Sequence, residues 1–127
     1  MNDLQERFVH FASLVFQTAA PLMKNSLIEP AIKHLVIASC SAGAIYPEVE
    51  SDSSGRNFQN KVRLALIELK EAQYWLHFLL DSNRDLSQLT PLVLETEELI
   101  KILSGISKKT NPGRKPIKQP ILLPFLF

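Results

Sequence analysis

Cysteine, glycine and long apolar runs are scarce in this sequence, and each scarcity excludes a class of protein. A single cysteine among 127 residues excludes a scaffold held together by disulfides. The four glycines are too far apart to form a phosphate-binding loop. No apolar stretch approaches the ~20 residues that a membrane-spanning helix needs. The first residues are acidic and polar, unlike a secretory signal, so we expect a cytoplasmic protein with no membrane contact.

Charge is nearly balanced over the whole chain but unevenly distributed. The 14 cations and 13 acids leave a net charge of +1, which excludes the strongly basic class of nucleic-acid-packaging proteins. From residue 108 onward there are five cations, several prolines and no acid, a composition typical of a tail. Residues 1–107 therefore hold nine cations against all thirteen acids, a net charge of −4. We predict a folded, acidic domain over 1–107 and a disordered, basic, proline-rich tail over 108–127 that ends in an apolar segment.

Apolar residues within 1–107 recur at helical spacing in four stretches, and no strand pattern competes with them. The first stretch covers about residues 4–22 and ends near Pro21, and the second covers about 27–46 with Pro30 in its first turn. The third runs from a Ser54 cap to about Asp81. The fourth begins at Thr90 or a turn earlier and ends near residue 106. Helices of this length with short connections predict an all-α fold, an antiparallel up-down four-helix bundle.

The third stretch is unusual because it carries two apolar faces. One face, which includes Val62, Leu69 and Leu76, suits the core. At ~100° per residue a second apolar group falls on the opposite side, and a small monomeric bundle buries only one face of a helix. An exposed patch of this size is uncommon on soluble monomers. We therefore predict an interface between copies of the chain, formed by Leu64, Ile67, Tyr74, Trp75 and Phe78.

Residue patterns that would support catalysis or metal binding are missing. The Glu-x-x-His pairs of di-metal bundles do not occur, and the three histidines fall on three different helices. Cys40 lies mid-helix without a basic neighbour, so we interpret it as a small packing residue rather than a reactive thiol. Ser39 and Gly43, four residues apart, are interpreted as positions where a neighbouring helix approaches closely. We expect no enzyme activity, no catalytic or metal-binding residues and no cofactor.

Two basic groups are candidates for nucleic-acid contact. Arg63 and Lys70 share one stripe of the third helix, a pattern that favours ordinary solvated charge and also suits nucleic-acid contact. The tail cations could attract nucleic acid without sequence preference; they are Lys108, Lys109, Arg114, Lys115 and Lys118. The final residues 121–127 are too few to span a membrane. They fit a peptide that docks in an apolar groove of the bundle or of a partner, or an extension without a role.

Several of these features together resemble one bacterial family. They are the run from Ser39 to Glu48, then Ser54, Phe58, Lys61–Leu66, Glu68, Glu71 and Tyr74–Leu76. In order and spacing they resemble the four-helix bundle proteins encoded in intervening sequences of 23S ribosomal RNA genes. The resemblance covers about residues 3–108. Ile37, Ile45, Asn57 and Gln73 depart from the family pattern, and two of these replace cations.

The resemblance implies a fold and a type of partner. It implies an up-down bundle that assembles as a homopentameric ring. The family includes the accessory variability protein of diversity-generating retroelements, which binds a reverse transcriptase and nucleic acid. Two hypotheses follow: a non-enzymatic self-assembling scaffold or adaptor for a protein or ribonucleoprotein, and an RNA- or DNA-binding accessory protein of an intervening sequence or a reverse transcriptase. The two lost cations and the acidic bundle favour the scaffold.

Overall fold

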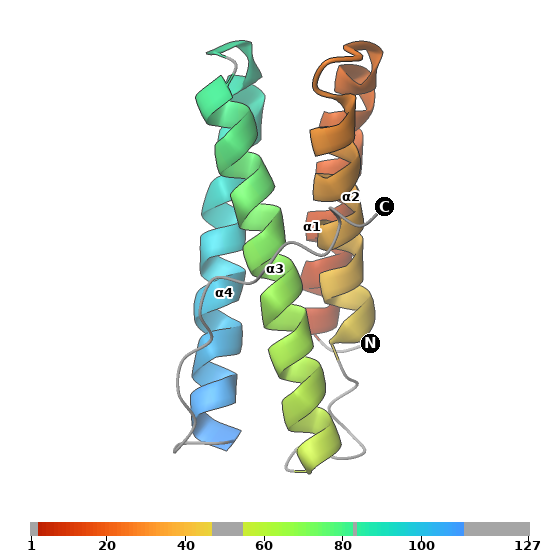
Figure 1. The fold of residues 1–127 in the computed structure, drawn as a ribbon. Coiled ribbons are helices and arrows are strands. Elements are labelled where there is room, and N and C mark those ends of the chain that lie inside the picture. The colour runs from red at the N-terminus through yellow and green to blue at the C-terminus, as the bar shows by residue number, and fades with distance from the viewer. Residues whose placement is uncertain (1–2, 47–54, 83, 111–127) are drawn as a thin grey trace.

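The computed structural model describes residues 3–46, 55–82 and 84–110, and within these ranges it contains helices and no strand. The fold consists of α1 Asp3–Ala19, α2 Glu29–Ile45, α3 Arg56–Ser82 and α4 Thr90–Thr110. Two short 3-10 helices, η1 Ala20–Lys24 and η2 Arg84–Leu89, follow α1 and α3. The four long helices alternate in direction and lie side by side (Figure 1). The predicted antiparallel four-helix bundle is confirmed.

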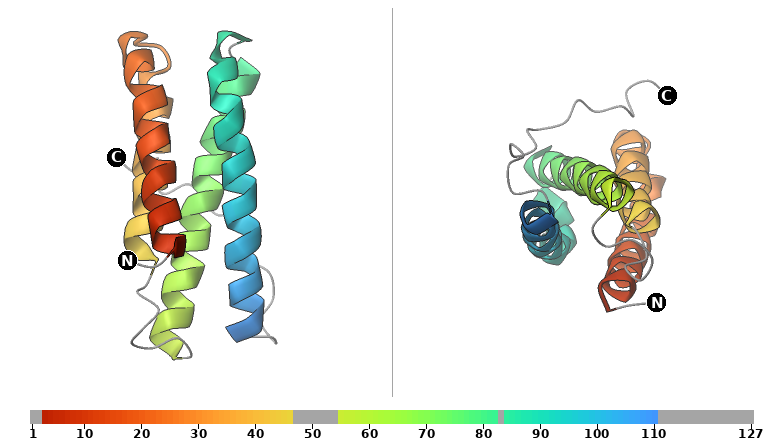
Figure 2. Two further views of the ribbon diagram at one scale, coloured as in Figure 1. Left: turned by 180° about the vertical axis from the view of Figure 1, so that it is seen from behind. Right: turned by 90° about the horizontal axis from the view of Figure 1, so that it is seen from below.

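The helices form a chain of neighbours rather than a symmetrical square. α2 packs most extensively on α3, α3 on α4, and α1 on α2, whereas α1 and α4 meet only narrowly (Figure 2). An ion pair joins these two helices: Arg7 Nε and Nη2 donate to Glu95 Oε2 and Oε1, each at 2.8 Å. The Glu95 carboxylate is thereby partly buried and tied to α1.

The core follows from the apolar stripe of each helix. In α1, Phe8, Phe11 and Val15 recur every three or four residues and are fully buried. On α3 the predicted inner face, which includes Leu69 and Leu76, is also buried. Two hydroxyls lie within this core, and each donates to the carbonyl one turn back: Ser39 Oγ to Leu35 O at 2.7 Å and Thr96 Oγ1 to Leu92 O at 2.6 Å. These bonds satisfy polar groups that would otherwise destabilise the core.

Small residues on α2 have the packing role that the sequence predicts, with one exception. A Cβ atom built on Gly43 would lie 3.0 Å from Phe8 Cβ, so the glycine lets α1 and α2 approach closely. Ser39 is fully buried between its neighbours. Cys40 is exposed, so its interpretation as a packing residue is wrong. Cys40 lies on the side of α2 that faces away from α1 and α3.

The boundary between the domain and the tail differs slightly from the prediction. α4 continues to Thr110, so Lys108 and Lys109 belong to the last turn of a helix instead of the tail. Cations in that position interact favourably with the negative end of the helix dipole. The predicted Ser54 cap and the rest of the predicted tail lie outside the described residues.

Candidate interaction surface

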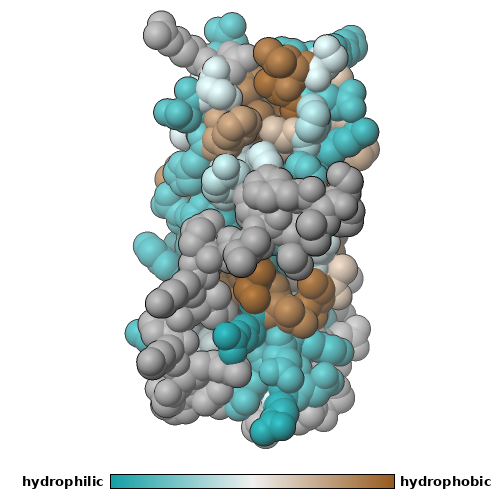
Figure 3. Space-filling model, viewed as in Figure 1, coloured by the Kyte–Doolittle hydropathy of each residue, from teal (hydrophilic) through white to brown (hydrophobic). Residues whose placement is uncertain are grey.

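The outer side of α3 carries a run of apolar side chains at the surface. We call the group formed by Leu64, Ile67, Tyr74 and Phe78 the α3 patch. Leu64 is 51% exposed, Tyr74 38% and Phe78 44%, while Ile67 is half-buried. On the face where α3 runs at the front, hydrophobic residues reach the surface near its upper end and again in its lower half (Figure 3). The opposite face of α3 fills the core, so this helix carries apolar side chains on two of its faces.

Trp75 is the exception among the five predicted interface residues. Its side chain is only 7% exposed, and its ring stacks on His34 of α2 with centroids 5.0 Å apart. Placing Trp75 at the outer interface is therefore a wrong prediction, since the residue belongs to the contact between α2 and α3. Tyr74 and Phe78 meet the indole edge-on, with centroids at 5.0 and 5.7 Å. The buried indole thus supports the exposed rings from beneath.

The aromatic side chains are held in one arrangement along two turns of α3. Tyr74 and Phe78 are four residues apart, so they lie on the same side of the helix. Their rings are 6.4 Å apart and nearly parallel, with an interplanar angle of 16°. A preformed aromatic surface loses little conformational freedom when a partner covers it. This geometry suits protein–protein contact, where tyrosine, phenylalanine and tryptophan are enriched.

The structure brings the candidate basic residues to two places. Arg63 and Lys70 are half-buried on α3, and Lys108 and Lys109 are exposed in the last turn of α4. Because α3 and α4 are antiparallel, the beginning of α3 and the end of α4 share one end of the bundle (Figure 1). Arg63 therefore lies nearer to the α4 lysines than Lys70 does. The remaining candidates, Arg114, Lys115 and Lys118, lie outside the described residues.

Two acidic residues of α3 are withdrawn from solvent. The Glu71 side chain is buried at 1% exposure, one helical turn before Trp75. Glu68 is half-buried, and this burial raises the pKa of its carboxyl group above the usual value for glutamate. A raised pKa in the folded state means that ionisation of Glu68 destabilises the fold.

The burial of Glu68 predicts a dependence of stability on pH. The folded state binds the Glu68 proton more tightly than the unfolded state, so this residue lowers stability as pH rises from about 4.3 through the raised pKa. We expect Glu68→Gln to raise the thermal midpoint at pH 7, and the gain to vanish below pH 4. Thermal unfolding of the wild-type protein and of the Glu68→Gln variant at pH 7 and below pH 4 measures the difference in midpoint. Equal midpoints at pH 7 would contradict the assigned desolvation, and Glu97→Gln on an exposed site is the control.

Histidine and cysteine do not gather into a metal site in the described part of the chain. Within residues 3–46, 55–82 and 84–110, no group of three or more histidine, cysteine or acidic side chains is placed to hold a metal ion. His34 packs on Trp75, and His10 and His77 lie exposed on α1 and α3. The same ranges contain no helix of the length and hydrophobicity needed to cross a membrane.

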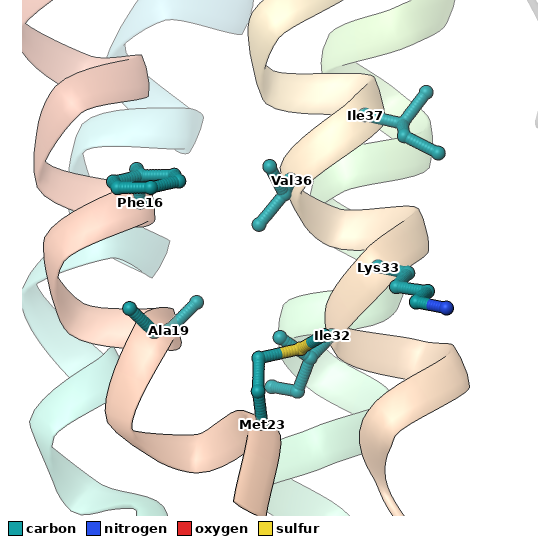
Figure 4. Close-up of a pocket in the computed structure, with 8 residues that line it drawn as sticks. Phe16, Ala19, Met23, Ile32, Lys33, Val36 and Ile37 are labelled. Carbon is teal, nitrogen blue, oxygen red and sulfur yellow. The ribbon is translucent and has the colours of Figure 1, made fainter.

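A second apolar surface, which sequence reasoning missed, lies between α1 and α2. A groove of about 350 Å³ opens there, and its walls are almost entirely apolar. In Figure 4, Phe16 extends from α1 toward Val36 of α2, Met23 lies at one end, and the Lys33 amine points away from the groove. We call this feature the α1/α2 groove; it is lined by Phe16, Ala19, Ala20, Met23, Ile32, Lys33, Val36 and Ile37. The sequence feature that could have indicated this groove is the presence of apolar residues such as Phe16 and Ile37 outside the inner stripes of α1 and α2.

Comparison with protein-family models, with curated proteins and with solved structures finds no match for this chain. The surfaces described above and the sequence resemblance therefore indicate the function of the chain. The α3 patch is the strongest of these surfaces, because the sequence predicts it and the exposed fractions of Leu64, Tyr74 and Phe78 agree with it.

Proposed function

We propose that this chain is a non-enzymatic, self-assembling helical bundle that serves as a scaffold or adaptor for a protein or ribonucleoprotein partner. The observation that carries the proposal is the α3 patch, an exposed aromatic and aliphatic surface on a helix whose opposite face already fills the core. A cluster of exposed large apolar side chains on one helix face is typical of an interaction site on a soluble protein.

The patch has the length that a lateral contact between bundles requires. Leu64 and Phe78 are 14 positions apart, which corresponds to about 21 Å along the helix axis. A copy packed along α3 would cover the patch over about half the length of this helix, whose 27 residues span about 40 Å. The resemblance to the intervening-sequence family implies that five copies close into a ring, and a closed ring requires a fixed rotation between subunits.

Replacing Tyr74 and Phe78 together by aspartate is expected to convert the oligomer into a smaller species. Each introduced carboxylate would have to be desolvated in the interface, which is strongly unfavourable, whereas both side chains already have access to water in the single subunit. Light scattering coupled to size-exclusion chromatography measures the mass. Leu94→Asp is the matched control, because Leu94 is an exposed apolar residue of α4. An unchanged mass in the double variant, with circular dichroism showing intact helices, would contradict the proposal.

Nucleic-acid binding is the second candidate function. The observation that favours it is the exposed pair Lys108 and Lys109 at the end of α4, at the same end of the bundle as Arg63. In this second proposal the chain is an accessory protein that binds RNA or DNA and is associated with an intervening sequence or a reverse transcriptase. The same chromatography tests it: bound nucleic acid gives excess absorbance at its own maximum, and the excess should fall as salt rises. An oligomer free of nucleic acid at low salt would contradict nucleic-acid binding, and the scaffold or adaptor role would remain as the proposed function.

A further inference from the structure

We propose that the end of the bundle formed by the start of α3 and the end of α4 binds the phosphate backbone of double-stranded nucleic acid without reading its sequence. This inference rests on the second proposed function, nucleic-acid binding, and names both the kind of nucleic acid and the surface that contacts it. We call this surface the α3/α4 pole; its six cations are Arg56, Lys61, Arg63, Lys101, Lys108 and Lys109.

The pole is positively charged because neither helix end carries an acid. Residues 55–67 and 99–110 contain the six cations and no aspartate or glutamate. Five of the cations are exposed, and Arg63 is half-buried. The segments that adjoin the pole along the chain, 47–54 and 111–127, lie outside the described residues. They carry three acids and three cations respectively, so together they leave the positive charge of the pole unchanged.

The cations of the pole do not hold the fold together. Among the described residues, the ion pairs join Arg7 to Glu95 at 2.8 Å and Lys33 to Glu29 at 3.1 Å, and no pole cation takes part in one. Charges of one sign gathered at one place repel each other and destabilise a compact structure. A polyanion that binds the pole relieves this repulsion and releases the counterions of its own backbone.

The pole projects beyond the first two helices, so a large partner can reach it. The Arg7–Glu95 ion pair places these residues at one height in the bundle. From this height α4 continues thirteen positions to Lys108, whereas α1 extends only four positions in that direction, to Asp3. At 1.5 Å per residue the end of α4 therefore lies about 14 Å past the start of α1. α3 also extends beyond α1 and α2 at this end (Figures 1 and 2).

Each helix of the pole presents a pair of cations two turns apart. Arg56 and Arg63 are seven positions apart on α3, and Lys101 and Lys108 are seven positions apart on α4. Each pair therefore lies on one side of its helix, with about 10 Å between its members. A duplex carries a phosphate every ~3.4 Å along each strand, so these cations meet phosphates on a duplex of any sequence. Such contacts position a protein without specifying bases.

The side chains around the cations favour a duplex over a single strand. Proteins that bind single strands stack successive bases on exposed aromatic rings. In the two described segments of the pole the only aromatic residue is Phe58, which is 5% exposed. The exposed rings of Tyr74 and Phe78 lie further along α3, in the α3 patch. A duplex keeps its bases stacked inside and presents its phosphates, so cations suffice to bind it.

The same side chains argue against an anionic membrane surface as the partner. Helices that lie on membranes combine cations with apolar side chains that enter the lipid boundary. Within residues 56–63 and 104–109 every exposed side chain is polar or charged; these are Arg56, Asn57, Asn60, Lys61, Lys108 and Lys109. The surface at this end of α3, beyond the lower hydrophobic group, is accordingly hydrophilic (Figure 3).

The test measures binding of the full-length protein to short fluorescent duplexes of RNA and of DNA, by anisotropy over a range of salt concentrations. The pole variant combines Arg56→Gln with Lys108→Gln, and the matched control combines Lys24→Gln with Lys33→Gln. Both variants lose two exposed cations, but Lys24 and Lys33 lie toward the opposite end of the bundle. Circular dichroism and light scattering check that fold and mass are the same in all three proteins.

We expect the logarithm of the binding constant to fall linearly with the logarithm of the salt concentration. The slope should be shallower by about 2 in the pole variant, about 1 for each lost phosphate contact, and unchanged in the control. Duplexes of different sequence should bind equally, because backbone contacts carry no sequence information. The RNA and DNA duplexes distinguish the two sources of the backbone.

Four results would overturn the inference. Equal slopes for the pole variant and the control would place the contact elsewhere on the chain. Single strands that bind as tightly as duplexes would remove the preference for a duplex and leave nucleic-acid binding standing. Equally tight binding to poly-L-glutamate or to vesicles that contain phosphatidylserine would make the pole a surface for another polyanion. Failure of every nucleic acid to bind at low salt would overturn the second proposed function as well, and the scaffold would still be tested by the mass of the Tyr74 and Phe78 variant.

Discussion

Replacing Gly43 by leucine at the contact between α1 and α2 is expected to lower the free energy of unfolding by about 1–3 kcal/mol. The Cβ atom alone would lie 3.0 Å from Phe8 Cβ, which is already closer than ordinary van der Waals contact. Phe8 is fully buried, and a close-packed core leaves a buried ring little room to move. The remaining leucine carbons would therefore force the two helices apart.

The gain in helix propensity from replacing Gly43 is smaller than the loss from overpacking. Glycine within a helix is less favourable than a side-chain-bearing residue by roughly 0.5–1 kcal/mol, so the substitution gains only that amount from helix propensity. Gly105→Leu on α4 isolates this gain, because a Cβ atom built at Gly105 has no neighbour within 4 Å. Guanidinium unfolding of both variants at one protein concentration measures the difference. If Gly43→Leu were as stable as Gly105→Leu, the close approach of α1 and α2 would be disproved.

The sequence predicts the fold well because helix periodicity reports directly on burial. The inner stripes of α1 and α3 are found in the core as expected, and Pro21 and Pro30 lie at the helix boundaries that their geometry favours. These are local features: each depends on residues within one or two turns, so no knowledge of the neighbouring helices is needed.

The errors concern positions at the edge of a stripe, where the neighbouring helix decides burial. Trp75 falls between the inner and outer faces of α3, and its ring is buried where it stacks on His34 of α2. The α1/α2 groove depends on the separation of two helices, which no periodicity records. The Arg7–Glu95 ion pair joins residues 88 positions apart, so local periodicity does not record it either. The candidate site was thus predictable where it lies on one helix and unpredictable where two helices form it.

The two apolar faces of α3 predict different outcomes for the same substitution. Leu69 is fully buried in the core, so Leu69→Ala is expected to lower the free energy of unfolding by about 2–5 kcal/mol at every protein concentration. Leu64 is 51% exposed on the α3 patch. In the isolated subunit Leu64→Ala should change stability by no more than about 0.5 kcal/mol.

The difference between the faces appears when unfolding is followed over a range of protein concentrations. Assembly stabilises the folded subunit by mass action, so the unfolding midpoint of an oligomer rises with concentration. Leu64→Ala should weaken association by about tenfold, equivalent to roughly 1.4 kcal/mol, and shift the concentration dependence without changing the midpoint of the dissociated subunit. Leu69→Ala should lower both. If Leu64→Ala left the concentration dependence unchanged, Leu64 would not belong to the subunit interface, and the α3 patch would be the docking surface for a different partner.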